Sequence, residues 1–526
     1  MLSRRISNSA SNPLRTFTTV TALKMPPRKR SSPTSSSSSS SPPPSKPSPA
    51  KKAKTSATPT KKAKVEQVVD EILGKGTWRD WPAPRDQMET AKSFILEAVK
   101  EKHRILLCPD KDADGLSSCL ILYRTLTEHL LHPPNLVQIY FLPKGINIHS
   151  DVAQSEMLSV KFSTDNDEKA TEAEVYQGPT RAIIMDQGSR PGPALLPPDK
   201  CSTLLIDHHQ SSEFPESITV LSACKSEPVA ATSILAYLLC CEMVPQLKED
   251  RETSMGALLG LYGDLGASKI NLTDPSLPWP SWLAQWEKTL TKTKLSKATA
   301  LLNAPRRTPE FNAKIAWEAL IGCKGELKGI MEDRALGEAK ERTSNETTRW
   351  QGAAPKFSKD GKVAVIRVDS GYQIHPVIAT RWQGTLRKAK TLVCIMCANT
   401  GYTEGKVNFS CRAPRRSKDD PHYNGPPDLI GFLKSCIPAC EALSPGWGDR
   451  VGHDFARGHR EATGGIIPTE EFEVLMKALE IGVKAEKKEG SSPAKKSGAK
   501  GVIDANQKNT LDGFFGIKPK KEKTED

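Results

Sequence analysis

Short apolar runs that alternate with helical segments constrain the fold of this chain more than any other feature. The runs at 104–108, 136–142, 181–186 and 203–207 have the length of buried strands, and 85–102 and 116–131 have the apolar spacing of helices. This alternation favours an α/β fold with a mostly parallel sheet. In such sheets ligands bind at the carboxyl ends of the strands. We therefore expect a functional site where these runs end.

Acids stand at strand or helix ends at four places in the chain. They are Asp110, Asp112 and Asp114 in "DKDADG", Asp186 in "IIMDQG", Asp207 with His208 and His209 in "LLIDHH", and Asp264 in "YGDLG". Alone, Asp207 would be read as a helix N-cap with incidental histidines. Several acids at one sheet edge repel one another unless cations neutralise them. Carboxylates mixed with imidazole suit Mn²⁺ or Mg²⁺, and two such ions can lower the pKa of a water and clamp a phosphoryl group. The pattern predicts metal-dependent phosphoester hydrolysis.

The ordered set D-x-D-A-D-G, D-x-G, D-H-H and G-D resembles the DHH phosphoesterase superfamily over roughly residues 100–270. Within it, "DKDADG" resembles the RecJ-type exonuclease branch. "KVNFSCRAP" (406–414) and "RGHREATGG" (457–465) resemble the substrate-binding strand and the glycine–histidine motif of the DHHA1 domain that follows in this family. The resemblance implies a parallel-sheet DHH domain, a smaller α/β DHHA1 domain, and successive strands that each deliver an acid.

The resemblance also implies roles for individual residues. Two Mn²⁺ or Mg²⁺ ions would be held, one by Asp112 and Asp186, the other by Asp114, Asp186, His208 and Asp264. Asp110 is a further candidate ligand, Asp207 would orient His208, and His209 would approach the phosphate. The expected substrate-binding residues in the second domain are Arg412, Gly458 and His459. Cys108 departs from the pattern, because the pyrophosphatase branch carries a metal-binding histidine there.

The expected activity is that of a RecJ-like exonuclease that degrades single-stranded DNA in replication or repair. Two alternatives stay open from the sequence. The first is an enzyme of short oligonucleotides (a nano-RNase) or a nucleotide phosphatase. The second is a catalytically inactive scaffold that binds a sliding clamp.

The formal charge of +14 arises from the ends of the chain. Residues 1–65 hold 14 of the 75 Lys and Arg residues and none of the 61 acids, and 66–482 are formally about −4. The Arg- and Ser-rich segment 1–24 resembles a mitochondrial presequence. Met25 then precedes Lys-rich clusters up to residue 64 that resemble a nuclear localisation signal. We expect a nuclear protein, with an additional mitochondrial form through residues 1–24.

The segment 506–521, "NQKNTLDGFFGIKPKK", resembles a PCNA-interacting peptide. Leu511, Phe514 and Phe515 have the spacing of that motif, although Lys508 stands at its first position. Disordered segments commonly bind partners in this way. Residues 507–515 therefore predict binding to the PCNA sliding clamp, and a chance apolar patch is the alternative.

Composition divides the chain into five parts. We expect a disordered basic region at 1–64, the catalytic domain at 65–275, a helical connector at 276–355, the DHHA1 domain at 356–482 and a disordered tail at 483–526. The pair Cys394 and Cys397 resembles half of a zinc site, but strand positions three apart face opposite sides of a sheet. No apolar run approaches the ~20 residues of a membrane span.

Overall fold

The structure is a computed structural model that describes residues 80–163, 176–386, 389–415, 425, 427–452 and 455–483. All of these residues belong to one unit, 61–526. The predicted targeting region, the residues 65–79 and the clamp-binding segment at 507–515 lie outside the described residues. The domain boundaries at 275 and 355 stay predictions. In the described part of the chain, no helix is both long enough and apolar enough to cross a membrane.

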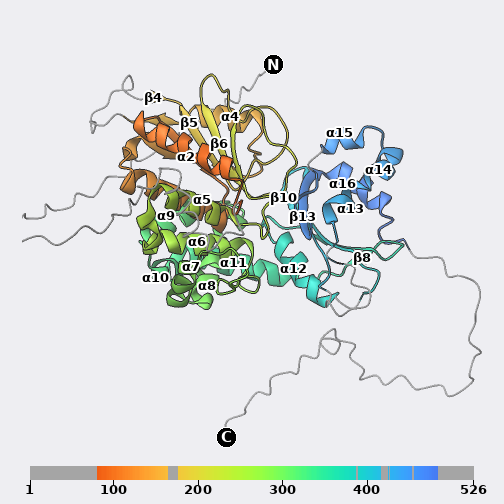
Figure 1. The fold of residues 1–526 in the computed structure, drawn as a ribbon. Coiled ribbons are helices and arrows are strands. Elements are labelled where there is room, and N and C mark those ends of the chain that lie inside the picture. Colours follow the sequence, from red (N-terminus) through yellow and green to blue (C-terminus); the bar gives the residue numbers. More distant parts are fainter. Residues whose placement is uncertain are drawn as a thin grey trace, which may run out of the picture. The chain divides into compact units, whose positions relative to one another are not determined.

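The first sheet is parallel throughout, as the alternation of strands and helices predicts (Figure 1). Its strands stand in the order β2 (Val137–Ile139), β1 (Ile105–Pro109), β5 (Arg181–Met185), β6 (Ser202–Asp207) and β7 (Thr219–Ser222). The chain leaves β1 for one neighbour, β2, and later returns to its other side with β5. Such a reversal opens a crevice at the carboxyl ends of the two strands, where open α/β sheets bind ligands.

Helices cover both faces of this sheet. Ile105 and Leu107 of β1 pack into the core formed with α2 (Arg85–Lys100), α3 (Ala113–Arg124), α5 (Thr232–Met243) and α6 (Arg251–Asp264). Leu106 and Cys108 face the other side, towards α4 (Asp151–Leu158). A short hairpin of β3 (Lys161–Phe162) and β4 (Tyr176–Gln177) follows α4.

Two element boundaries differ from those predicted. The helix expected at 116–131 begins at Ala113, because the side chain of Asp112 caps its N-terminus. It changes to a π-helical turn, η1, at Thr125–His129. The strand expected at 136–142 is shorter, since only Val137–Ile139 pair with β1.

The predicted helical connector contains α7 (Ser281–Leu290), α8 (Lys292–Leu302), the 3₁₀ turn η5 (Pro305–Arg307), α9 (Ala313–Gly322), α10 (Leu327–Glu332) and α11 (Arg334–Trp350). Its tryptophans serve packing: Trp279 meets Trp81 edge to face at 5.4 Å, and the Trp282 indole donates to the Tyr237 hydroxyl. The connector shares the core of the first sheet.

A second, mixed sheet follows, in the order β12-β13-β11-β10-β9-β8. Its strands are β8 (Lys356–Phe357), β9 (Val363–Val368), β10 (Cys394–Thr403), β11 (Lys406–Arg412), β12 (Arg457–His459) and β13 (Ala462–Pro468). One face packs on α12 (His375–Thr385), and the other on α13 (Leu429–Lys434), α14 (Ile437–Leu443), α15 (Trp447–Val451) and α16 (Thr469–Ala478). Cys394 and Cys397 face these opposite cores, which argues against a zinc site built on this pair.

Candidate metal centre and phosphate site

Strand register aligns three of the predicted acids along one edge of the first sheet. Pro109 pairs with Met185, and Met185 pairs with Ile206, so Asp110, Asp186 and Asp207 stand side by side. The amide of Asp110 donates to Met185 O at 2.9 Å, and the amide of Asp186 donates to Ile206 O at 3.0 Å. Asp186 has a φ of 61°, a left-handed conformation that costs energy in a residue with a Cβ. Such strain at the end of a strand is typical of functional positions.

Asp112 and Asp114 are held by helix N-termini. Asp112 Oδ1 accepts hydrogen bonds from the amides of Asp114 and Gly115 at the start of α3. Asp114 is 2% exposed, and its two carboxylate oxygens accept from the amides of Thr232 at 2.8 Å and Ser233 at 2.9 Å, where α5 begins. Both helix ends favour negative charge, so they fix these carboxylates in place.

His208 lies between two of the acids. Its Nε2 is 3.4 Å from Asp186 Oδ1, and its Nδ1 is 3.5 Å from Asp264 Oδ2. The ring is 3% exposed, and Nδ1 has no hydrogen-bond partner among the described residues. Asp264 is the last residue of α6, so the fourth acid comes from the end of a helix. The tight packing of α6 on α3 brings it to the same place.

These side chains form overlapping groups whose ligand atoms lie within 4.8 Å of one another. The groups are Asp110, Asp112 and Asp186; Asp114, Asp186 and His208; Asp186, Asp207 and His209; and His208, His209 and His459. Asp186 belongs to three of the four, so it would help to hold more than one ion if two ions bind. The oxygen and imidazole donors fit Mn²⁺ or Mg²⁺. The site can therefore hold metal ions.

Electrostatics support this fit. Burial and the neighbouring Asp264 raise the pKa of Asp114 to about 7. Burial and the charge of Asp114 raise the pKa of Asp186 well above its usual range. Burial also acts to raise the pKa of Asp110, at the outer side of the site. The charges of Lys111 and Arg306 outweigh burial, so the pKa of Asp110 is lowered. The centre therefore carries more buried negative charge than its protein neighbours neutralise, which divalent cations would correct.

Asp207 contacts a different histidine from the one expected. Its Oδ1 is 2.8 Å from Nδ1 of His209, and it also accepts from the backbone amides of His208 and His209. Although burial opposes it, Asp207 raises the pKa of His209 to about 9. Asp207 therefore orients the His209 ring, while the His208 ring faces Asp186 and Asp264. The N-cap alternative is wrong, because no helix follows Asp207.

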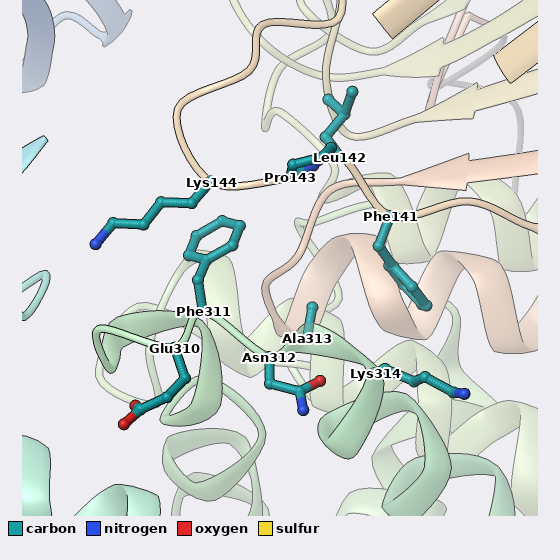
Figure 2. A pocket seen from close by; sticks show the side chains of 9 residues that line it. All are labelled: Phe141, Leu142, Pro143, Lys144, Glu310, Phe311, Asn312, Ala313 and Lys314. Carbon is teal, nitrogen blue, oxygen red and sulfur yellow. The ribbon is translucent and has the colours of Figure 1, made fainter. Parts of the chain in front are cut away.

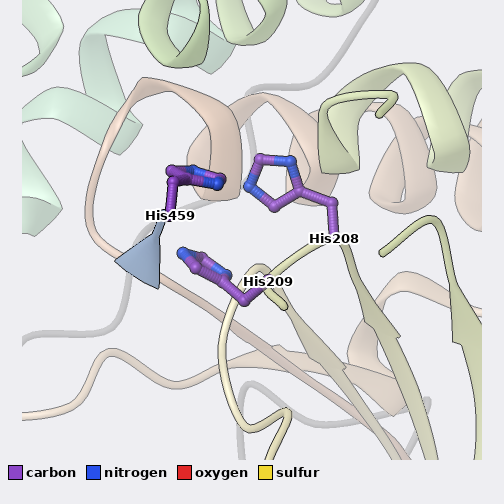
Figure 3. Close-up of side chains that lie close together, drawn as sticks. All are labelled: His208, His209 and His459. Carbon is purple, nitrogen blue, oxygen red and sulfur yellow. The ribbon is translucent and has the colours of Figure 1, made fainter. Parts of the chain in front are cut away.

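The second sheet contributes His459 to the same place (Figure 3). Its ring stacks on His209 with centroids 5.7 Å apart and meets His208 edge to face at 5.5 Å. Its Nε2 is 3.7 Å from Asp264 Oδ1. Gly458 has a φ of 118°, and a Cβ there would lie 2.8 Å from Ala462 O, so glycine is required for His459 to reach the site. Three imidazoles thus surround the space beside the metal ligands.

The structure brings a cluster of cations next to the metal ligands, which the sequence did not predict. Arg306 in η5 lies 3.4 Å from Asp112 Oδ2 and donates to Asn303 and Gln373. Burial and the charges of Arg306 and Arg412 lower the pKa of Arg307 to about 10. The charge of Asp112 offsets part of this effect. Burial and then Arg412, Arg307 and Arg306 lower the pKa of His375 to about 3. These like charges come from the connector and the second sheet, and they would attract an anion such as a phosphate.

Gly260 of α6 packs directly against Asp114 and Ser233. An added Cβ would meet Ser233 Oγ and lie 2.5 Å from Asp114 Oδ1. We expect Gly260→Ala to displace Asp114 and to lower the free energy of unfolding by about 1–3 kcal/mol in urea titrations. Gly337→Ala in α11 is the matched control, because nothing lies within 4 Å of its Cβ position and alanine favours a helix. Equal free energies of unfolding for the two variants would contradict the close packing of Gly260 against Asp114.

The comparisons with known proteins agree with this geometry. The family model "DHH family, N-terminal domain" matches residues 104–262, the segment that includes β1, β5, β6 and most of α6. Residues 104–262 therefore form a domain of the DHH family. Members of this family are metal-dependent phosphoesterases, and this domain is assigned to that class of hydrolases. No curated protein sequence matches the chain.

Two solved structures share the fold. RecJ from Thermus thermophilus, in complex with Mn²⁺, is 16% identical with a TM-score of 0.51, and the match covers 78% of this chain and 56% of that one. A DHH-domain protein described as a member of a family of ribosomal proteins is 15% identical with a TM-score of 0.52. That match covers 81% of this chain and 98% of that one. At these identities the likeness is one of fold.

Proposed function

We propose that this protein is an exonuclease that hydrolyses single-stranded DNA with two Mn²⁺ or Mg²⁺ ions. The observation that carries the proposal is the cluster of metal ligands next to a cluster of arginines. Asp112 is the link between them, because it lies in the first ligand group and 3.4 Å from Arg306. A strand with one phosphate at the ions and its neighbour at the arginines would fit this arrangement.

The reaction would be attack of water on phosphorus, with cleavage of the bond to the leaving oxygen. Bound ions would neutralise the carboxylates and lower the pKa of the attacking water. The chain itself would hold the ions through Asp112, Asp114, Asp186, His208 and Asp264. His209, fixed by Asp207, and His459 stand where they would contact the phosphate. Arg412, whose guanidinium is tied to Ser410 Oγ at 2.8 Å, would bind the adjacent phosphate.

The test is incubation of the full chain with Mn²⁺ and single-stranded DNA labelled separately at either end. We expect mononucleotide release that stops on chelation and in an Asp207→Ala, His208→Ala double variant. The label released first gives the polarity. Cleavage of trinucleotides alone would replace the proposal with the short-oligonucleotide enzyme, and cleavage of neither substrate would favour the inactive scaffold.

We also propose that the protein works in the nucleus and binds the PCNA clamp through residues 507–515. The support is the spacing of Leu511, Phe514 and Phe515 and the basic clusters before residue 64. Clamp capture by the full chain should be lost in a Phe514→Ala, Phe515→Ala variant that retains nuclease activity. Unchanged capture would remove the motif from consideration.

A further inference from the structure

A pocket of about 280 Å³ opens between the segment after β2 and the segment that leads into the first residues of α9. The first segment supplies Phe141 to Lys144, and the second supplies Glu310 to Lys314. None of the predicted metal ligands or substrate-binding residues lines it. Figure 2 shows the Phe311 ring lying beneath the Pro143–Lys144 turn.

Phe311 is held in an unusual backbone conformation. Its φ is 54°, a left-handed value that is an outlier for a bulky residue. The conformation is fixed on both sides, because the Phe311 amide donates to Thr308 O and its carbonyl accepts from the amide of Ala313. The ring is nevertheless only half-buried. A glycine would adopt this turn without strain, so an aromatic ring here points to a contact with a ligand.

Lys111 connects the pocket to the metal centre. Its Nζ lies 3.2 Å from Asp110 Oδ1 and 5.6 Å from the centroid of the Phe311 ring. Asp110 and Asp112, on either side of Lys111, both belong to the first group of metal ligands. A molecule that reaches from the ions into the pocket would therefore pass the Lys111 amine.

The other charges of the pocket also favour a negatively charged chain with flat apolar groups. Lys144 places Nζ 4.1 Å from the centre of the Tyr402 ring and 3.5 Å from Gly371 O. The one lining acid, Glu310, pairs with Arg342 at 2.6 Å, so its charge is balanced. Aromatic rings interleaved with lysines are the usual surface for single-stranded nucleic acid.

We propose that this pocket binds the base of the nucleotide next to the scissile phosphate, with Phe311 as the stacking surface. Lys111 and Lys144 contact the adjoining phosphates of the same strand. The inference rests on the proposed function and names how its substrate is held. It also gives the enzyme a means to prefer nucleotides over phosphate compounds that lack a base, because stacking needs a base.

The test uses single-stranded DNA with phosphorothioate linkages, which keep their charge and resist hydrolysis, and with 2-aminopurine placed at successive positions. In the presence of Mn²⁺, the full chain should quench the fluorescence at one or two positions only, where the base stacks. Phe311→Ala should abolish this quenching and raise Kd about tenfold, and Phe311→Trp should retain it. Phe357→Ala is the matched control, because Phe357 is 40% exposed on β8 and lines no part of the pocket.

Phe311→Gly separates a binding role from a structural one. Glycine accepts the positive φ, so its melting temperature should equal or exceed that of the wild type while Kd rises as in Phe311→Ala. A lowered melting temperature with unchanged Kd would overturn the proposal.

The outcomes also separate this inference from the proposed function. Nuclease activity without quenching that depends on Phe311 overturns the pocket alone. Quenching that depends on Phe311, without hydrolysis of ordinary strands, overturns the exonuclease and supports the pocket. Failure of the wild type to bind the probe overturns both.

Discussion

Asp186→Asn should lower kcat by about 10³-fold while the fold persists. Asp186 shares three of the four ligand groups, so the substitution removes the one carboxylate that can bridge two ions. A metal ion stabilises transition-state charge by several kcal/mol, and each 1.36 kcal/mol is a tenfold change in rate. The measurement is the single-turnover rate of hydrolysis in saturating Mn²⁺.

The same substitution should make the metal-free protein more stable. The neutral amide has nearly the same shape, and asparagine tolerates the φ of 61° that Asp186 adopts. It also removes a buried charge and relieves the repulsion from Asp114, the two effects that raise the pKa of Asp186. In EDTA the variant should therefore melt above the wild type. In Mn²⁺ this order should reverse, because ligand binding stabilises the native state by mass action.

A surface acid gives the matched control for this prediction. Asp274 lies in an exposed turn, where its carboxylate accepts hydrogen bonds from Ser276 and touches no metal ligand. Asp274→Asn should leave kcat and the metal-dependent rise in melting temperature unchanged. If Asp186→Asn kept wild-type kcat, Asp186 could not be the bridging ligand.

The first sheet could be predicted from the sequence because its strands are local signals. The run 203–207 is apolar on both faces, as a strand covered by helices on both sides requires. Parallel strands end at one edge, so acids that follow them must lie close together. This reasoning brings Asp110, Asp186 and Asp207 together without knowledge of the tertiary structure.

Contacts between distant segments could not be predicted in the same way. Asp112 and Arg306 are 194 residues apart in sequence, and nothing in the polar connector marks Arg306 or Arg307 as part of a site. The partner of Asp207 depends on the turn that follows β6, and a turn of this kind has no periodicity to read. The conformation of Phe311 is likewise set by its tertiary surroundings. The sequence therefore indicates which chemistry the sheet edge supports, but not how the substrate is held.

Arg307→Met should produce a protein that is more stable but binds its substrate less well. Burial and the nearby Arg306 and Arg412 disfavour the charge of Arg307, which lowers its pKa. Replacement with an apolar side chain of similar length removes this repulsion and should raise the free energy of unfolding by about 1 kcal/mol. Loss of one buried charged contact to a phosphate costs a few kcal/mol, so we expect KM for single-stranded DNA to rise about 100-fold.

The melting temperature measured with and without an anion distinguishes phosphate binding by the arginines from a simple change in packing. Inorganic phosphate should raise the melting temperature of the wild type and have a smaller effect on Arg307→Met, because the anion would bind among the arginines. Arg334→Met controls for loss of charge, since the Arg334 side chain is 93% exposed and pairs only weakly with Glu338. It should change stability by less than about 0.5 kcal/mol and leave KM alone. A lower free energy of unfolding for Arg307→Met would contradict this explanation. It would mean that the arginine cluster stabilises the packing of the two sheets, with its like charges balanced by a counter-ion from the protein.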